Sequence, residues 1–331
     1  MTHEERIEAV AAYGFTNRQA TFLTTAMLHG GVCVQRQYCS FAGIARGQVV
    51  RDFFAYLVER KFASAHPYAR PGSLIYHIHH KGLYRAIGEP DSRCRRRSSL
   101  ERALARMMLL DAVLLRPGLM WLATEREKLT YFLHRRQINE QDLPQTRFGT
   151  GETRTKRFFT DRLPIGIGTG DDITFAYLVT EPTGARLREF LENHLPLLRA
   201  LSRWTLLLVL PPIFSAAEPA HRKAVMNLCA PPVRPDVVDE FRWYCAVRRS
   251  IEAKDTPTVH GDVARFSRAR RAFGSPRFFA VYRQWLREGD PALGRLLSPA
   301  FHDAWGAGVI AVECLVLPYA YAELDGLVQS A

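Results

Sequence analysis

Several short motifs that mark common enzyme classes are absent from this sequence. It contains no GxxxxGK phosphate-binding loop, no GxSxG or HExxH motif and no zinc-finger spacing. Its one HxxR motif runs from His3 to Arg6, whereas a tyrosine recombinase carries that motif in its C-terminal half, with a nucleophilic tyrosine after it. The sequence therefore predicts a protein without catalytic residues of its own, without a cofactor and without a bound metal.

Signals for export or membrane insertion are also lacking. Residues 1–10 are charged and have no apolar core of a signal peptide, and the six cysteines form no CxxC pair. The most apolar stretch, 306–322, is short and carries Glu313 and Pro318, which favours a buried strand over a membrane span. We expect a protein of the bacterial cytoplasm with reduced thiols and no membrane contact.

Positive charge is abundant, and its distribution is uneven. The net charge of the chain is +12. Residues 1–110 contain 16 Lys and Arg against 8 Asp and Glu, a net +8, while residues 111–214 and 215–331 each contribute only +2. This concentration of charge predicts a polyanionic partner for the N-terminal third.

The first 88 residues have the pattern of a winged helix-turn-helix domain. The expected elements are, in order, a helix from Thr16 to about His29, a short strand at 32–34, a helix at 35–44, an amphipathic helix within 43–64, and a hairpin from 62–68 and 74–80. In this arrangement the third helix enters the major groove of DNA and the hairpin lies along the backbone.

The third helix carries the residues expected to contact DNA. Its polar front end suits base edges, because Arg can bond guanine and Gln can bond adenine bidentately; these residues are Arg46, Gln48 and Arg51. Other cations of the domain suit phosphate contacts; they are Arg60, Lys61, Arg70 and Lys81. The alternative is a helical domain with a solvated basic face.

Histidines and arginines extend this surface beyond the third helix. On a strand His77 and His79 share one face and His80 points the other way, which favours wing residues that touch DNA over a metal site. Residues 89–99 form a basic linker in which Arg95, Arg96 and Arg97 are expected to follow the phosphates. A solvated connector is the alternative for this linker.

Residues 100–214 read as a helical connector followed by an α/β domain. The expected elements are a helix at 99–115, a helix that starts at Thr124, strands within 157–167 and 172–181, a helix at 185–201 and a strand at 204–212. Asp161 and Glu181 fit the two carboxylate positions of a PD-(D/E)xK nuclease core, in which carboxylates hold Mg²⁺ and a lysine assists water. Thr183 stands where the lysine is needed and Pro182 interrupts the motif, so we favour a nuclease-like fold without activity over an active nuclease.

Residues 215–331 read as a mainly helical region. A long stretch at 265–289 interleaves arginines with aromatic residues. The aromatic side chains follow helical spacing and are expected to be core; they are Phe278, Phe279, Tyr282 and Trp285. The arginines at the start of the stretch are candidates for a secondary contact with DNA; they are Arg265, Arg268, Arg270 and Arg271.

The overall expectation is therefore an α+β protein, and two resemblances refine it. The N-terminal half is similar to the winged-helix module of replication-relaxation proteins of mobile elements. The whole chain, notably 1–16, 158–167 and 199–212, resembles the cointegrate resolution protein T group. That resemblance implies an accessory protein that binds double-stranded DNA at the resolution site of a replicative transposon and assists a tyrosine recombinase.

Two other functions stay open. A transcriptional repressor or plasmid regulator would use the same winged helix without a recombinase, and an active metal-dependent nuclease would use Asp161 and Glu181. Self-association as a homodimer also stays open.

Overall fold

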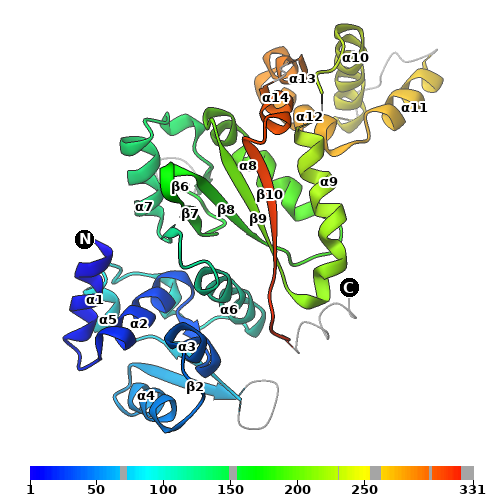
Figure 1. The fold of residues 1–331 in the computed structure, drawn as a ribbon. Coiled ribbons are helices and arrows are strands. Elements are labelled where there is room, and N and C mark those ends of the chain that lie inside the picture. Colours follow the sequence, from blue (N-terminus) through cyan, green and yellow to red (C-terminus); the bar gives the residue numbers. More distant parts are fainter. Residues whose placement is uncertain (68–72, 149–154, 230, 254–261, 298–299, 322–331) are drawn as a thin grey trace.

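The computed structural model describes residues 1–67, 73–148, 155–229, 231–253, 262–297 and 300–321. Helices and strands are mixed in this part of the chain, as the sequence predicts, and they fall into three regions (Figure 1). A helical module with a small sheet forms the N-terminal region, a five-stranded sheet lies at the centre, and a group of helices precedes the last strand. Among these residues no helix has both the length and the apolar character needed to cross a membrane.

The N-terminal module has its helices and strands close to the expected places. The Thr16 side chain accepts a hydrogen bond from the Gln19 amide and the Gln19 side chain accepts one from the Thr16 amide, so a capping box starts the second helix. The elements are α1 (His3–Ala11), α2 (Asn17–His29), β1 (Val32–Cys33), α3 (Gln35–Ala42), α4 (Gln48–Glu59), β2 (Ala63–Pro67), β3 (Leu74–Ile78) and α5 (Lys81–Ala86). Helices α1 and α5 were not expected.

The three short strands of this module form one antiparallel sheet with β3 in the middle. Its core is rich in aromatic rings, because Phe22 of α2, Tyr38 of α3, Phe54 of α4 and Tyr76 of β3 are all buried together. Phe54 and Tyr76 have ring centroids 4.4 Å apart, which ties α4 to the hairpin. The position of α4 is therefore fixed by the core beneath it.

The segment expected to be a basic linker is docked on this module. At Gly31 (φ 71°) a Cβ would lie only 2.5 Å from the Cys94 carbonyl oxygen, so glycine permits the close approach of the two backbones. A short 3₁₀ helix, η1 (Arg93–Arg95), lies at this contact. The alternative of a solvated connector is therefore wrong for residues 93–95.

The central sheet has the strand order β10-β9-β8-β7-β4. Strands β8 and β9 are parallel, β9 and β10 are parallel, and the pairs β8–β7 and β7–β4 are antiparallel. The strands are β4 (Met120–Leu122), β7 (Ile165–Ile167), β8 (Ile173–Leu178), β9 (Trp204–Leu210) and β10 (Ile310–Val316).

Helices cover both faces of this sheet. Alternate residues of β9 face opposite ways, so Leu206 and Leu208 pack in one cluster and Leu207 and Val209 in another. The first cluster includes side chains of α8 (Ala185–Ala200) and α9 (Glu218–Leu228), and the second is built on α6 (Leu100–Leu114). Helix α6 lies between the sheet and the N-terminal module (Figure 1).

The single strand expected within 157–167 is instead two strands in different sheets. Strand β6 (Thr155–Phe158) pairs with β5 (Gln145–Phe148), and β7 belongs to the central sheet. Between them Phe159 (φ 47°) and Arg162 (φ 59°) adopt left-handed backbone conformations that break the extended chain. Before β5 the chain forms α7 (Glu125–Leu129), started by the expected Thr124 capping box, then a π-helix η2 (Thr130–Arg135) and a 3₁₀ turn η3 (Glu140–Asp142).

The C-terminal region is mainly helical and then returns to the sheet. Its elements are η6 (Pro212–Ala217), α9, α10 (Pro235–Glu252), α11 (Val263–Ala272), α12 (Pro276–Glu288), η7 (Asp290–Leu293), α13 (Gly294–Leu297) and α14 (Ala300–Gly306). The stretch 265–289 covers most of α11 and all of α12. Strand β10 follows α14 and pairs with β9 over its whole length, so this region also contributes to the central sheet (Figure 1).

Candidate nucleic-acid interface

Helix α4 has one face in the core and the other in solvent. Val50, Phe53, Phe54 and Leu57 are buried and follow helical spacing, as expected. The opposite face lies at the outer end of the N-terminal module, away from the central sheet (Figure 1). The helix is therefore firmly anchored and still open to a partner.

The polar residues at the start of α4 are exposed and bonded to one another. The Arg51 guanidinium donates to the Gln48 side-chain oxygen at 2.9 Å, and the Gln48 amide donates to the Asp52 carboxylate at 2.5 Å. These contacts join neighbours on one solvent-facing turn, so a partner can exchange them at low cost. Both Gln48 and Arg51 are thus available where a recognition helix would meet base edges.

Arg46 precedes α4 and is held in place by α3. Its Nε donates to the Gln35 side-chain oxygen at 3.1 Å, and the Gln35 amide donates to the Tyr76 hydroxyl at 3.1 Å. This chain of bonds runs from the hairpin strand β3 to the front of α4. It orients an exposed guanidinium without neutralising its charge.

The cations expected to contact phosphates are exposed wherever the structure describes them. Arg60 ends α4 with its guanidinium 5.5 Å from the Tyr56 ring centroid, and Lys61 (φ 56°) follows in a left-handed conformation. Lys81 is exposed at the start of α5. Arg70 lies outside the described residues.

The histidines at the end of the hairpin are more buried than the sequence suggests. His77 is only 6% exposed, and its Nε2 donates to the Cys94 carbonyl oxygen at 3.0 Å. Burial lowers the pKa of His77, which favours the neutral ring. The expectation that His77 touches DNA is therefore wrong, because β3 lies between β1 and β2 and the His77 ring is bonded to the backbone of residue 94.

His79 and His80 have other roles. His79 is half-buried beside His77, with ring centroids 5.8 Å apart, and burial lowers its pKa too. His80 accepts a hydrogen bond from the Leu83 amide through Nδ1 and so caps α5. Of these three histidines, His79 and His80 keep part of their surface exposed, and the His80 ring is already used as the cap of α5.

The three linker arginines differ from one another. The Arg95 guanidinium is half-buried and donates to the Pro90 and His79 carbonyl oxygens, at 2.7 and 3.4 Å, so its role is structural. Arg96 and Arg97 are exposed. Only the last two remain free for phosphate contacts, and the expectation for Arg95 is corrected.

A buried polar network links the N-terminal module to the end of the described chain. Arg36 of α3 makes two bonds of 2.7 Å to Asp111 of α6, and the Tyr321 hydroxyl donates to the same carboxylate at 2.5 Å. The Arg36 guanidinium also stacks 3.7 Å from the Tyr319 ring centroid. Sequence reasoning missed this network, since its members are far apart in the chain.

The two carboxylates of the expected nuclease motif lie at one end of the sheet, and each has partners. Because Ile165 of β7 pairs with Phe175 of β8 in antiparallel register, Asp161 before β7 and Glu181 after β8 lie at the same end. Asp161 accepts from the Leu163 amide at 2.9 Å and lies 3.3 Å from His194 Nε2 of α8.

Glu181 acts as a cap for the start of α8. Its carboxylate accepts bonds from the Thr183 amide at 2.9 Å, the Thr183 hydroxyl and the Arg186 amide at 3.2 Å. Burial acts to raise the pKa of Glu181, but these hydrogen bonds outweigh burial and hold the pKa below its usual value. The buried His221 of α9 has its Nε2 4.0 Å from this carboxylate.

A buried lysine stands next to Asp161, although not where the motif requires it. Lys128 of α7 is 1% exposed, and its Nζ donates to the Leu163 carbonyl oxygen at 2.6 Å. Burial lowers the pKa of Lys128 to about 8, and the Asp161 charge opposes that shift. Burial also lowers the pKa of His194, which is 2% exposed. The spacing of Lys128 with Tyr131 and Phe132 on one helical face is the sequence signal that could have shown this lysine to be inside.

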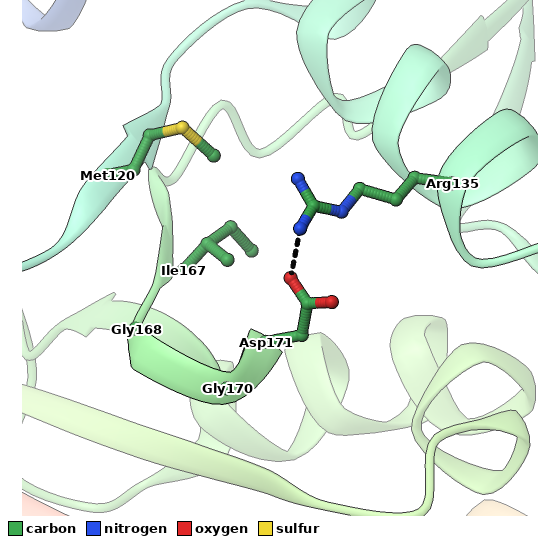
Figure 2. Close-up of a pocket in the computed structure, with 6 residues that line it drawn as sticks. All are labelled: Met120, Arg135, Ile167, Gly168, Gly170 and Asp171. Carbon is green, nitrogen blue, oxygen red and sulfur yellow. Dashed lines mark ion pairs between the residues drawn. The ribbon is translucent and has the colours of Figure 1, made fainter.

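An open pocket of about 310 Å³ lies at the other end of β7. Figure 2 shows Arg135 of η2 and Asp171 pointing toward each other across it, with Nη2 and Oδ1 2.8 Å apart. Met120, Ile167, Gly168 and Gly170 complete its lining. Because its charged residues pair with each other, this pocket offers no free group for a charged ligand.

The arginines of α11 are only partly available. Arg265 makes a double hydrogen bond to Glu240 of α10, at 2.6 and 3.0 Å, and stacks 3.9 Å from the Trp243 ring centroid. Arg268, Arg270 and Arg271 are exposed. As expected, Tyr282 and Trp285 are buried and Phe278 packs against the same cluster. The expectation that Phe279 belongs to the core is wrong, because this side chain is 38% exposed.

Among the residues that the structure describes, no three His, Cys, Asp or Glu side chains are grouped so that they could hold a metal ion. Comparison with protein-family models, curated proteins and solved structures finds no match for this chain.

Proposed function

We propose that this protein binds double-stranded DNA in a sequence-specific manner through α4. The observation that carries the proposal is the front end of α4, where Arg46, Gln48 and Arg51 are exposed on a helix held by four buried apolar side chains. Arg and Gln are the side chains that read guanine and adenine in the major groove. Within the described chain, no carboxylate of another element pairs with Arg46 or Arg51.

The order of elements supports a winged helix-turn-helix. Helices α2, α3 and α4 precede the β2–β3 hairpin, and α3 and α4 are joined by a short turn with Gly43 in a left-handed conformation (φ 64°). In that family of folds the third helix enters the major groove and the hairpin lies along the backbone. Exposed Arg60 and Lys61 then fall between the helix and the wing, where they can position the duplex.

Binding to a selected and a random duplex tests this proposal. A duplex is selected from a randomised pool, and the affinity of the wild type is compared with that of Gln48→Ala and Arg51→Ala. Each substitution should cost about 1–3 kcal/mol on the selected duplex and much less on a random one. Arg287→Ala, an exposed arginine of α12, is the matched control. Equal losses on both duplexes would mean that these residues touch only phosphate.

The biological setting that we propose is a transposon resolution site. The resemblance to cointegrate resolution proteins supports an accessory role beside a tyrosine recombinase on the bacterial nucleoid. Footprinting across the intergenic region next to its own gene, with and without the neighbouring recombinase, tests this role. An extended footprint with both proteins supports it, whereas a footprint over a promoter that the recombinase leaves unchanged favours a repressor.

We further propose that the α/β domain is a nuclease-like core without activity. Two features support this: Glu181 is taken up in capping α8, and Thr183 occupies the position of the cation. Lys128 does approach Asp161, but its amine is buried and bonded to the Leu163 carbonyl oxygen. In this arrangement the domain acts as a scaffold.

A further inference from the structure

Three arginines that belong to different elements converge beside α6. Arg93 lies in η1, Arg106 in α6, and Arg162 in the turn before β7. Each lacks an acidic partner, and indeed any side-chain hydrogen bond, among the residues that the structure describes. Most other arginines near the central sheet are paired, as Arg157 is with Glu125 at 2.7 Å.

Packing contacts bring the three elements together. Arg106 of α6 packs against Gly30, since a Cβ on Gly30 would lie 3.1 Å from the Arg106 Cβ. The next residue, Gly31, packs against Cys94 of η1. Leu163, the neighbour of Arg162, packs against the apolar cluster built on α6. The junction between the N-terminal module and the central sheet therefore gathers three positive charges.

The electrostatics of Arg162 reflect this crowding. Partial desolvation lowers the pKa of Arg162, and the positive charges of Arg93, Arg106 and Arg157 lower it further. Like charges that are brought together without a counter-charge repel one another and do not stabilise the fold. Such a cluster is typical of a surface that an anion completes.

Arg106 differs from the other two arginines in that one of its unpaired donors is buried. Its Nη1 is buried and has no hydrogen-bond partner. Buried donors without partners are uncommon, because each loses its bonds to water. A guanidinium has several N–H donors in one plane, which matches the oxygens of a phosphate group.

We propose that Arg93, Arg106 and Arg162 form a binding site for backbone phosphate of duplex DNA, at the junction of the N-terminal module and the α/β domain. The site rests on the proposed DNA binding and extends it beyond α4, to residues that read no sequence. Arg93 and Arg162 are exposed, so the site is an open surface suited to a long polyanion. The excess charge of residues 1–110 favours DNA over a small phosphate compound.

The salt dependence of binding to a random duplex tests the site. The double variant Arg93→Gln/Arg162→Gln should lower the log–log slope by roughly one for each lost phosphate contact and weaken binding to selected and random duplexes alike. Arg287→Gln, which removes one exposed charge elsewhere, should leave the slope unchanged. If the wild type binds and the double variant keeps the wild-type slope, the proposal is wrong.

Thermal unfolding provides the second readout. Because the substitutions relieve repulsion, the double variant should unfold at the same temperature as the wild type or higher, which excludes loss of binding through misfolding. Inorganic phosphate at constant ionic strength should stabilise the wild type more than the double variant. Loss of that stabilisation with an unchanged DNA slope would overturn the DNA assignment and leave a site for free phosphate.

The same data separate this proposal from the function of α4. A reduced slope in the double variant, with no preference of the wild type for a selected duplex, would refute sequence-specific reading and support the junction site. A wild type that binds no duplex would overturn both.

Discussion

The N-terminal module and the α/β domain use charged residues in opposite ways. On the module Arg46, Arg51 and Lys61 face solvent from elements that an aromatic core holds in place. In the α/β domain Lys128 and His194 are inside, each bonded to a backbone carbonyl oxygen and each close to Asp161. In the module the charged side chains are free to contact a partner, whereas in the α/β domain they are paired inside the fold.

The comparison has consequences for function. A side chain that binds DNA must be able to exchange its solvent contacts, as the exposed end of α4 can. A catalytic side chain must reach a substrate, and the buried amine of Lys128 does not reach the surface. In the function that we propose, the module binds DNA and the α/β domain serves as a scaffold, and the following predictions test that division.

The largest effects are expected from matched core deletions in the two regions. Phe54→Ala in α4 and Phe175→Ala in β8 both empty a fully buried site, and each should lower the free energy of unfolding by about 3–5 kcal/mol. Denaturant unfolding measures this loss. At low denaturant Phe54→Ala should lose sequence-specific binding, whereas Phe175→Ala should retain most of it. Equal loss of specific binding would show that the regions are not separable.

The next effect concerns the network that joins the two regions. Asp111→Ala leaves Arg36 and Tyr321 without their shared acceptor and should lower the free energy of unfolding by about 3 kcal/mol. Because Arg36 belongs to α3, the variant should also loosen the module against α6. Hydrogen exchange of the α3 amides measures this loosening.

Arg116→Ala is the control for that variant. Arg116 and Glu313 form an exposed pair at 3.1 Å, so its loss should cost under about 1 kcal/mol. If Arg116→Ala lowers the free energy of unfolding as much as Asp111→Ala does, the exposed and the buried ion pairs contribute equally to stability.

A smaller effect should appear in the pH dependence of stability. Burial lowers the pKa of Lys128 to about 8, against 10.5 for the unperturbed side chain. Between these values the unfolded state binds more protons, so the free energy of unfolding rises with pH through the window. Compared with Lys128→Met, the wild type should gain up to roughly 2–3 kcal/mol between pH 7 and pH 10.5.

Lys223→Met, at an exposed lysine of α9, is the control for the pH experiment. Its curve of unfolding free energy against pH should run parallel to that of the wild type. Parallel curves for Lys128→Met as well would contradict the burial of a titrating amine.

Local signals in the sequence predicted most elements. Thr16 and Ser99 each cap the helix expected after them, and the apolar stripe of α4 is buried as its spacing indicates. The alternating faces of β9 could not be read from its sequence, since a strand covered on both sides is apolar throughout. The predicted caps and the predicted apolar stripe both rest on interactions between residues close in the chain.

Long-range contacts explain what the sequence did not predict. The burial of His77 depends on β1 and on residues 93–95, and the Asp111 network needs Tyr321 from the other end of the described chain. The break between β6 and β7 needs left-handed conformations at Phe159 and Arg162, residue types that carry no turn signal. The junction of three arginines is likewise visible only once the elements are packed.

The smallest effect on DNA binding is expected from the carboxylates of the α/β domain. Glu181→Ala removes the acceptor for the Arg186 amide at the start of α8, and it should cost about 1 kcal/mol of stability, as the loss of a helix cap does. Since Glu181 lies at the sheet rather than on α4, affinity for the selected duplex should stay within the error of the measurement.

Cleavage of supercoiled plasmid in the presence of Mg²⁺ decides what these carboxylates do. We expect no nicking by the wild type, because hydrolysis needs carboxylates free to hold the metal and a cation that can reach the attacking water. Glu181 is bonded to Thr183 and Arg186, and the Lys128 amine is bonded to a backbone oxygen. The α/β domain would be a nuclease if the wild type nicks the plasmid and both Asp161→Ala and Glu181→Ala abolish the nicking. The control Glu189→Ala, on α8, should then still nick the plasmid. Without such nicking, strand exchange should require a separate recombinase, and the contribution of this protein would be to hold the DNA.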